Sequence, residues 1–192
     1  SQDDDGDYWE YYNYAIGEST EPGSTFKLPA LITAIEDGYI SLTDSVETGD
    51  GQAEFHGEIM RDSKEDGYGK ITIKEAFAVS SNIGVMRIIE RYYANQPEKF
   101  IKGLKQMKLG EPIGIELAGE GQPLIKDPSD NSWSLITPLW TSIGYEVQAT
   151  PLQILTFYNA IANDGKMAKP KIVNKVIDKS RVVKSILTEV IC

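Results

Sequence analysis

The sequence has 192 residues, 41% hydrophobic and 25% charged, which is typical of a single globular domain. Acidic residues outnumber basic ones by 29 to 19, and the net charge of -10 argues against nucleic acid or an anionic membrane as a binding partner. The chain contains no run of 18 apolar residues, and one cysteine with one histidine excludes the usual zinc sites.

The first third of the sequence predicts a loop, a helix and a long exposed segment, residues 41–70, which we call the excursion. Residues 1–22 are acidic and aromatic, and predict a lead-in loop that closes on the turn signal Glu21-Pro22-Gly23. From Ser24 the apolar residues recur every three or four positions until Gly38, which predicts a helix over 24–37 with its early turns distorted by Pro29. Residues 41–70 are glycine-rich without a sustained period, and predict an exposed segment with one hairpin around 53–59.

The middle of the chain predicts three helices. Thr72 and Glu75 have the spacing of a capping box, which predicts a short helix over 73–79. A second helix is expected over 83–93, and Pro97 opens a third that ends at Gly110.

The remaining residues predict one well-signalled helix among irregular segments. Residues 110–148 are expected to be mostly loop, with extended pieces at 115–117 and 140–143. Thr150-Pro151-Leu152-Gln153 combines an N-cap, a first-turn proline and a capping-box glutamine, so a helix should reach residue 164. We therefore expect a helical core over 23–165, followed over 166–192 by a strand at 171–177 and an incomplete terminal helix at 181–191.

A serine and a lysine three residues apart stand at the predicted helix start, as Ser24-Thr25-Phe26-Lys27. Residues i and i+3 share a helical face, with the helix dipole beneath the serine. A serine hydroxyl needs a base to act as a nucleophile at neutral pH, and a lysine is such a base when its pKa is lowered. The pattern is common by chance, and taken alone it favours a helix cap with a solvated lysine over a catalytic pair.

Several other strings follow in order, and together they identify a family. They are Ser80-Ser81-Asn82-Ile83-Gly84, Gly114-Ile115-Glu116-Leu117, Ser142-Ile143-Gly144-Tyr145 and Ala149-Thr150-Pro151-Leu152-Gln153. With Glu21-Pro22-Gly23-Ser24-Thr25-Phe26-Lys27, they resemble the transpeptidase domain of class B penicillin-binding proteins, of the cell-division or elongation type.

The resemblance implies an α+β fold of the serine β-lactamase/D,D-peptidase type and a D,D-transpeptidase that cross-links peptidoglycan stem peptides ending in D-Ala-D-Ala. By this resemblance Ser24 would be the nucleophile and Lys27 its base. Ser80 would relay a proton to the leaving nitrogen, and Asn82 would hold a substrate amide. The backbone N–H of Ser24 would be one oxyanion donor.

The resemblance also implies partners and a location. It implies neither a cofactor nor a metal. The expected partners are the stem peptide, β-lactam antibiotics and divisome or elongasome membrane proteins, on the periplasmic side of the cytoplasmic membrane.

The sequence departs from the family at its third motif. Neither Lys-Thr-Gly nor Lys-Ser-Gly occurs in the 192 residues, and the nearest string is Lys179-Ser180-Arg181. We therefore expect a partial domain, mainly the helical part with much of the central sheet missing, that is scarcely active by itself. Two alternatives stay open: a serine β-lactamase, which shares the Ser-x-x-Lys opening, and a non-catalytic scaffold that binds peptidoglycan or divisome partners.

Other residues predict ordinary structural roles. His56 has no second ligand in its glycine-rich stretch and is expected at the surface. Four acidic residues lack the spacing of a calcium loop and are expected to be solvated: Asp50, Asp62, Glu65 and Asp66. Three aromatic residues are expected to pack in or against the core: Trp133, Trp140 and Phe157.

Overall fold

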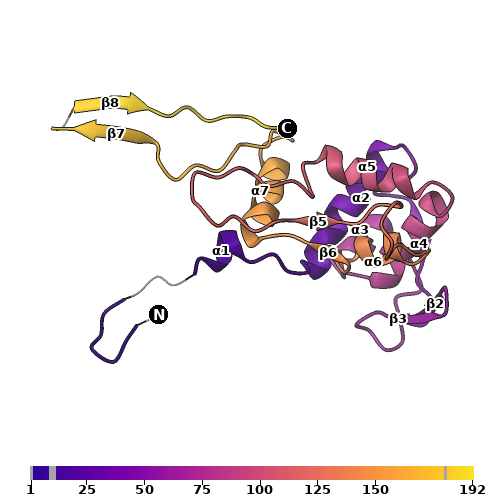
Figure 1. The fold of residues 1–192 in the computed structure, drawn as a ribbon. Helices are drawn as coiled ribbons and strands as arrows, with labels where there is room; N and C mark the ends of the chain where they lie inside the picture. Colours follow the sequence, from indigo (N-terminus) through magenta and orange to yellow (C-terminus); the bar gives the residue numbers. More distant parts are fainter. Residues whose placement is uncertain (1, 9–11, 180) are drawn as a thin grey trace.

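The computed structural model describes residues 2–8, 12–179 and 181–192. Figure 1 shows a helical body from which the last two strands project to one side. Within the body, α2 (Lys27–Glu36) packs against α4 (Asn82–Tyr93), α5 (Pro97–Gln106) and α6 (Thr137–Ser142). A further helix, α7 (Pro151–Ala162), contacts the short α1 (Tyr14–Gly17), and none of the described helices has the length and apolarity to span a bilayer.

The strands form four separate antiparallel pairs. β1 (Ser45–Glu47) pairs with β4 (Lys70–Thr72), and β2 (Gln52–Phe55) pairs with β3 (Glu58–Arg61). β5 (Leu124–Ile125) pairs with β6 (Val147–Gln148), and β7 (Lys175–Asp178) pairs with β8 (Arg181–Ser185). The α+β class is confirmed, and every sheet among the described residues has two strands.

The hydrophobic core lies where α2, α4 and α5 meet. Each of these helices places its apolar stripe inward, and burying one such side chain contributes about 1.5–3 kcal/mol. The most deeply buried members, each at most 1% exposed, include Phe26, Ala30, Ile83, Met86, Ile89, Tyr93, Phe100 and Leu104. As expected, Phe157 is buried, and Trp133 and Trp140 pack partly buried against this core.

The predicted helix over 24–37 is found in two parts. A 3₁₀ turn, η1 (Gly23–Phe26), runs directly into α2. Pro29 has no N–H for the carbonyl of Thr25, and that carbonyl instead accepts a 2.9 Å hydrogen bond from the Tyr158 hydroxyl on α7. The helix stops at Gly38 as expected, because Gly38 has φ +72° and lets Tyr39 N–H reach back to Ala34 O at 3.0 Å.

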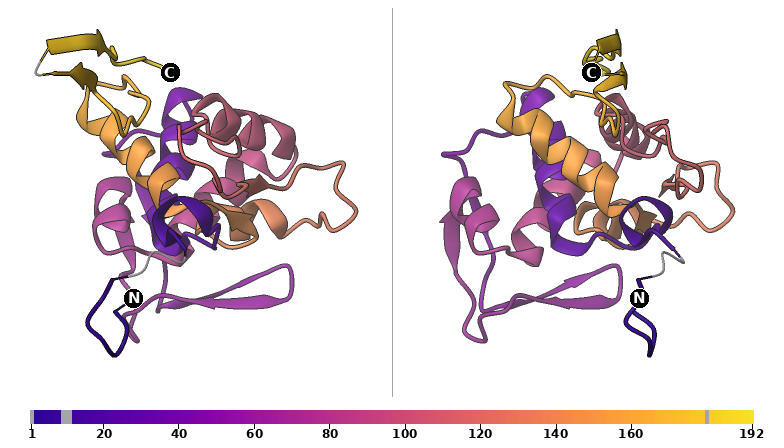
Figure 2. Two further views of the ribbon diagram at one scale, coloured as in Figure 1. Left: turned by 60° about the vertical axis from the view of Figure 1, so that its left-hand side comes forward. Right: turned by 90° about the vertical axis from the view of Figure 1, so that its left-hand side faces the viewer.

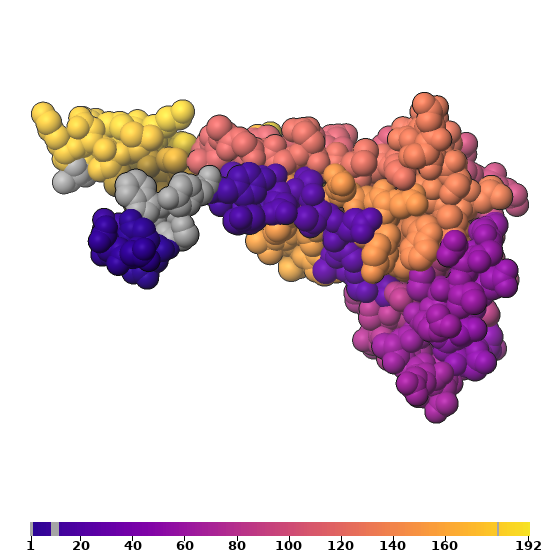
Figure 3. Space-filling view, turned by 60° about the horizontal axis from the view of Figure 1, so that its bottom comes forward, coloured from indigo at the N-terminus to yellow at the C-terminus, as the bar shows by residue number. Residues whose placement is uncertain are grey.

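The predictions that rest on local capping and turn signals are confirmed. α3 (Ile73–Ala78) begins at the Thr72–Glu75 capping box, and α7 begins at the Thr150–Gln153 box. The expected hairpin is β2–β3, which turns through His56 and Gly57. In Figure 3 the excursion over 41–70 projects from the body as a separate lobe.

Three predicted elements are wrong. Residues 140–143 lie largely in α6 rather than in a strand, because Pro138 starts a short helix that packs against α4. Residues 181–191 contain β8 rather than a helix, since the β-branched pair Val182-Val183 favours a strand. The ribbon β7–β8 stands away from the helices in both views of Figure 2. Residues 115–117 form no strand.

Candidate active site

The segment that carries Ser24 is fastened to a segment far along the chain. Thr20 and Ala149 exchange backbone hydrogen bonds of 3.2 and 3.0 Å, and Gly23 N–H donates to Gly144 O at 3.1 Å. The N–H of Glu146 adds a 2.9 Å hydrogen bond to a carboxylate oxygen of Glu21. Two strings of the family resemblance, about 120 residues apart in the sequence, therefore fix each other.

Glycine is required where these two strings meet. Gly144 has φ +85°, and a Cβ added there would lie 2.0 Å from the carbonyl oxygen of Gly23. A contact that short with backbone atoms leaves no room for any side chain. Gly144 thereby permits the backbone approach that positions the turn holding Ser24.

Lys27 is the buried cation of the site. The residue is 1% exposed, and its ammonium donates hydrogen bonds to Ser80 O at 2.5 Å and Ser80 Oγ at 2.9 Å. Burial lowers the pKa of Lys27 to about 8, although the negative charge of Asp62 acts in the opposite direction. A lysine in this state is partly neutral slightly above pH 7, as a general base must be.

Ser80 is held in an unusual backbone conformation between α3 and α4. Its φ is +56°, in the left-handed region that non-glycine residues rarely adopt. The neighbouring amides secure this turn, since Ser80 N–H donates to Phe77 O and Ser81 N–H to Ala76 O. Such strain is kept where it aims a side chain, and here Ser80 Oγ faces Lys27.

Asn82 follows this turn as the first residue of α4. Its side-chain amide donates a 3.0 Å hydrogen bond to the carbonyl of Arg61, at the end of β3. The hairpin β2–β3 therefore fixes the orientation of the Asn82 amide.

The structure brings some of the predicted site residues into contact and not others. Lys27 and Ser80 meet directly, as described above. Ser24 is exposed in η1, where its carbonyl accepts from Lys27 N–H, and among the described residues its hydroxyl makes no hydrogen bond. The Lys27 side chain thus bonds to Ser80 rather than to Ser24, in contrast to the close Ser24–Lys27 pair that the i, i+3 spacing suggests.

Asp62 is buried, contrary to the prediction from the sequence. It was expected among the solvated acids, yet it is only 9% exposed and its carboxylate binds the start of α4. Its partners lie about 20 residues further along the chain, and no local periodicity signals a contact of that kind. Asp50, Glu65 and Asp66 are exposed as expected, and His56 lies at the surface 3.7 Å from Glu90.

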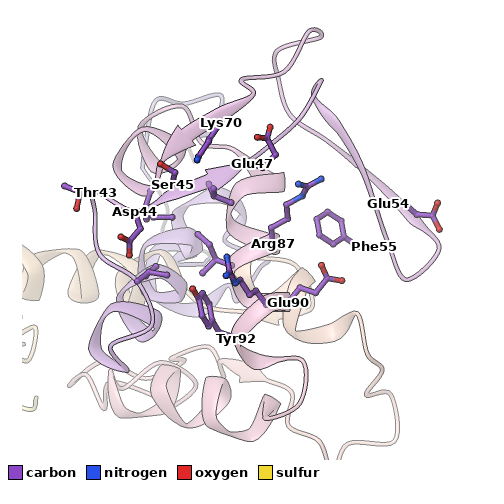
Figure 4. Close-up of a pocket in the computed structure, with 15 residues that line it drawn as sticks. Thr43, Asp44, Ser45, Glu47, Glu54, Phe55, Lys70, Arg87, Glu90 and Tyr92 are labelled. Atoms are coloured by element: carbon purple, nitrogen blue, oxygen red, sulfur yellow. The ribbon is translucent and has the colours of Figure 1, made fainter.

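A large open cavity lies away from these motif residues, none of which lines it. It measures about 1040 Å³ and lies between α4 and the strands of the excursion, with Arg87, Glu47 and Phe55 at its wall (Figure 4). A smaller open hollow of about 600 Å³ flanks η1 and is lined by Pro22, Thr25, Ile154, Leu155 and Tyr158 among others. This hollow borders η1, but Ser24, Lys27, Ser80 and Asn82 are not among the residues that line it.

Comparison with known proteins defines the class of protein. The chain belongs to the family described as the penicillin-binding protein transpeptidase domain, which residues 1–190 match. It is 33% identical over 165 residues to the penicillin-binding protein PbpB of Mycobacterium tuberculosis, covering 86% of this chain and 23% of that protein. It is 31% identical over 166 residues to stage V sporulation protein D of Bacillus subtilis, covering 86% and 25%.

A solved structure agrees with these relatives. The crystal structure of penicillin-binding protein 3 from M. tuberculosis, complexed with ampicillin, matches with a TM-score of 0.76 and 28% identity, over 92% of this chain and 38% of that one. The chain thus spans about a quarter of the length of the curated relatives it matches.

Proposed function

We propose that this chain carries the acylation site of a penicillin-binding D,D-transpeptidase, with Ser24 as nucleophile, Lys27 as base, Ser80 as proton relay and Asn82 as substrate-binding residue. The observation that carries the proposal is the buried Lys27 ammonium bonded to Ser80, in a chain of the transpeptidase family. If Ser-x-x-Lys were only a helix cap, the lysine side chain would be solvated. Lys27 is instead buried and bonds to Ser80, 53 residues further along the chain.

The reaction begins when neutral Lys27 takes the proton of Ser24 Oγ, which attacks the carbonyl carbon of the penultimate D-alanine. The negative charge that develops on the carbonyl oxygen is met by Ser24 N–H, a group at the start of η1. The amide C–N bond then breaks, and the terminal D-alanine leaves with a proton passed from Lys27 through Ser80 Oγ, an arrangement that their 2.9 Å hydrogen bond supports. An amine of a second stem peptide then attacks the carbonyl carbon of the Ser24 ester and forms the new amide bond as the ester C–O bond breaks. The proton that the amine loses passes to Ser24 Oγ, which restores the free hydroxyl.

The same acylation step accounts for penicillin as a ligand. Ser24 opens the β-lactam ring and keeps the acyl group, because the amine that leaves stays attached to the same molecule. The complex of the M. tuberculosis relative with ampicillin supports this ligand class. Stem peptides ending in D-Ala-D-Ala and divisome or elongasome proteins complete the proposed partners, on the periplasmic side of the membrane.

The proposed domain organisation has a lead-in over 1–22, a helical core over 23–165 with both motifs, and a terminal segment over 166–192. We assign it to the serine β-lactamase/D,D-peptidase type of fold. Because no Lys-Thr-Gly or Lys-Ser-Gly string occurs in these residues, one oxyanion donor and the cation for the substrate carboxylate are not supplied by them. Loss of one such donor typically costs about 10²- to 10³-fold in rate.

Labelling with a fluorescent penicillin tests the proposed function. The product of the complete reading frame that contains this sequence is expected to form a stable acyl adduct, whereas the 192-residue chain alone is scarcely labelled. Rapid hydrolysis of the adduct with turnover of penicillin would indicate a β-lactamase instead. Absence of any adduct in the complete product would favour a non-catalytic scaffold.

A further inference from the structure

Asp62 occupies a position that the proposed reaction does not use. It directly follows β3, and its own N–H is fixed by a 3.0 Å hydrogen bond to Gly51 O. Although it belongs to the exposed excursion, its side chain turns inward and is buried. A carboxylate that is buried needs partners, because isolated charge in the protein interior is costly.

The two carboxylate oxygens of Asp62 bind the residues that surround Asn82. Oδ2 accepts from Ser81 Oγ at 2.7 Å, and Oδ1 accepts from Ile83 N–H at 3.1 Å. Ser81 Oγ in turn accepts from Gly84 N–H at 2.8 Å, so the carboxylate extends the N-terminal cap of α4. The adjacent Arg61 carbonyl holds the Asn82 amide at 3.0 Å.

These hydrogen bonds, which we call the clamp, hold three consecutive residues at the start of α4. Arg61 and Asp62 together hold Ser81, Asn82 and Ile83, and the strained Ser80 comes immediately before them. A backbone with φ above zero at a non-glycine residue persists only when its surroundings determine it from several sides. The clamp determines it from one side, the carbonyls of α3 accept from the Ser80 and Ser81 amides on another, and Lys27 bonds to Ser80 itself.

We propose that Asp62 is a positioning residue of the transpeptidase site, which aims Ser80 and Asn82 through its clamp on α4 and places a negative charge at the turn to which the buried Lys27 ammonium bonds. The inference rests on the proposed function, because its consequence is measured in acylation. Two observations carry it independently: the pair of hydrogen bonds from one buried carboxylate, and the burial of Lys27 against the same turn.

Asp62 is the charged group that acts on Lys27. Its field raises the pKa of Lys27, against the larger lowering effect of burial, and among the described residues no other charge is found to contribute. Other charged residues on the packed helices have surroundings of their own: Glu36 ends α2, Glu75 is engaged by Thr72, Arg87 lines the large cavity, and Lys102 is exposed on α5.

The test is the pH profile of acylation by penicillin, measured by stopped-flow on the complete reading-frame product. In the Asp62→Asn variant the amide oxygen can still accept from Ile83 N–H, and the Ser81 hydroxyl can rotate to accept from the new NH₂ group. The shape of the clamp is retained while its charge is lost. We expect the midpoint of the ascending limb to move to lower pH, so that the rate at pH 7, as a fraction of the plateau, rises about twofold or more.

Two matched variants separate charge from clamp. Asp66→Asn removes an equal charge from an exposed residue of the same excursion, and should leave both midpoint and plateau unchanged. Ser81→Ala removes one arm of the clamp but keeps the charge, and should lower the plateau while leaving the midpoint in place.

The outcomes distinguish this inference from the proposed function. A wild-type protein that is not acylated contradicts both. An acylated wild type whose midpoint is unchanged, or moves to higher pH, in Asp62→Asn contradicts the role of Asp62 alone. Unfolding of Asp62→Asn and of a second uncharged variant, Asp62→Thr, would also contradict it, because the amide is expected to preserve the clamp.

Discussion

Replacing Gly144 by alanine should damage the site that holds Ser24. The added Cβ would lie 2.0 Å from the oxygen and 2.6 Å from the carbon and nitrogen of Gly23, all backbone atoms that cannot rotate away. Gly119 offers a matched control, because its φ of +87° nearly equals the +85° of Gly144 and nothing lies within 4 Å of its added Cβ. Both substitutions therefore place alanine at a positive φ, but only Gly144→Ala also brings the new Cβ into contact with backbone atoms.

The backbone cost of alanine at positive φ is about 1–2 kcal/mol, and we expect Gly119→Ala to lose about that much stability. In Gly144→Ala the backbone segments at Gly23 and Gly144 must move apart, which also breaks the 3.1 Å hydrogen bond between these residues. We expect a total loss of about 3 kcal/mol or more, measured by urea unfolding of the 192-residue chain. A displacement of η1 by about 1 Å would lower acylation of the complete product about 10²-fold.

Equal losses of stability in the two variants would refute this reasoning, because the collision would then contribute nothing. Normal acylation in Gly144→Ala would show that the contact with Gly23 does not position Ser24. A loss of acylation in Gly119→Ala as large as in Gly144→Ala would attribute the effect to backbone strain in general.

The remaining predictions concern a base, a hydroxyl and a cap. Acylation should rise with pH to a plateau above about 8, the pKa of Lys27, and Lys27→Arg should abolish it, since a guanidinium keeps its proton. Because that pKa is below the ordinary 10.5, the unfolded chain binds more protons than the folded chain between about pH 8 and pH 10.5. The free energy of unfolding should therefore rise with pH over this range, and it should rise less in Lys27→Met. Tyr158→Phe should cost about 1 kcal/mol in urea unfolding and slow acylation, since it leaves the Thr25 carbonyl without its donor. Thr150→Ala should cost about 1 kcal/mol through loss of the cap at Gln153, with acylation retained, and a neutral result in unfolding would contradict the capping assignment.

The elements that the sequence predicts correctly are those with signals inside the element. α3 and α7 begin at capping boxes whose two members are three residues apart, and α2 ends at a glycine in the left-handed region. α6 and β8 have weaker local signals, Pro138 in the first turn of α6 and the pair Val182-Val183 in β8, each within a short apolar run. A short apolar run fits either a strand or a helix, so tertiary packing decides for α6 and strand pairing for β8.

In the site, too, the sequence predicts the residues that are close together in the chain and not the contacts between distant ones. Ser24 and Lys27 are recognisable together because they are three residues apart, and Ser80 joins them only through the family resemblance. The contact between Lys27 and Ser80 spans 53 residues, and Asp62 reaches Ser81 across 19. Contacts at such separation depend on how helices pack, which neither periodicity nor spacing records.

Mass spectrometry of the penicillin adduct tests the central claim most directly. The complete reading-frame product is exposed to penicillin, its intact mass is measured, and the modified peptide is identified after digestion. We expect one added penicillin per chain, located at Ser24, and no addition to the Ser24→Ala variant under the same conditions. An adduct on any other residue, or full labelling of Ser24→Ala, would contradict the assignment of Ser24 as the nucleophile.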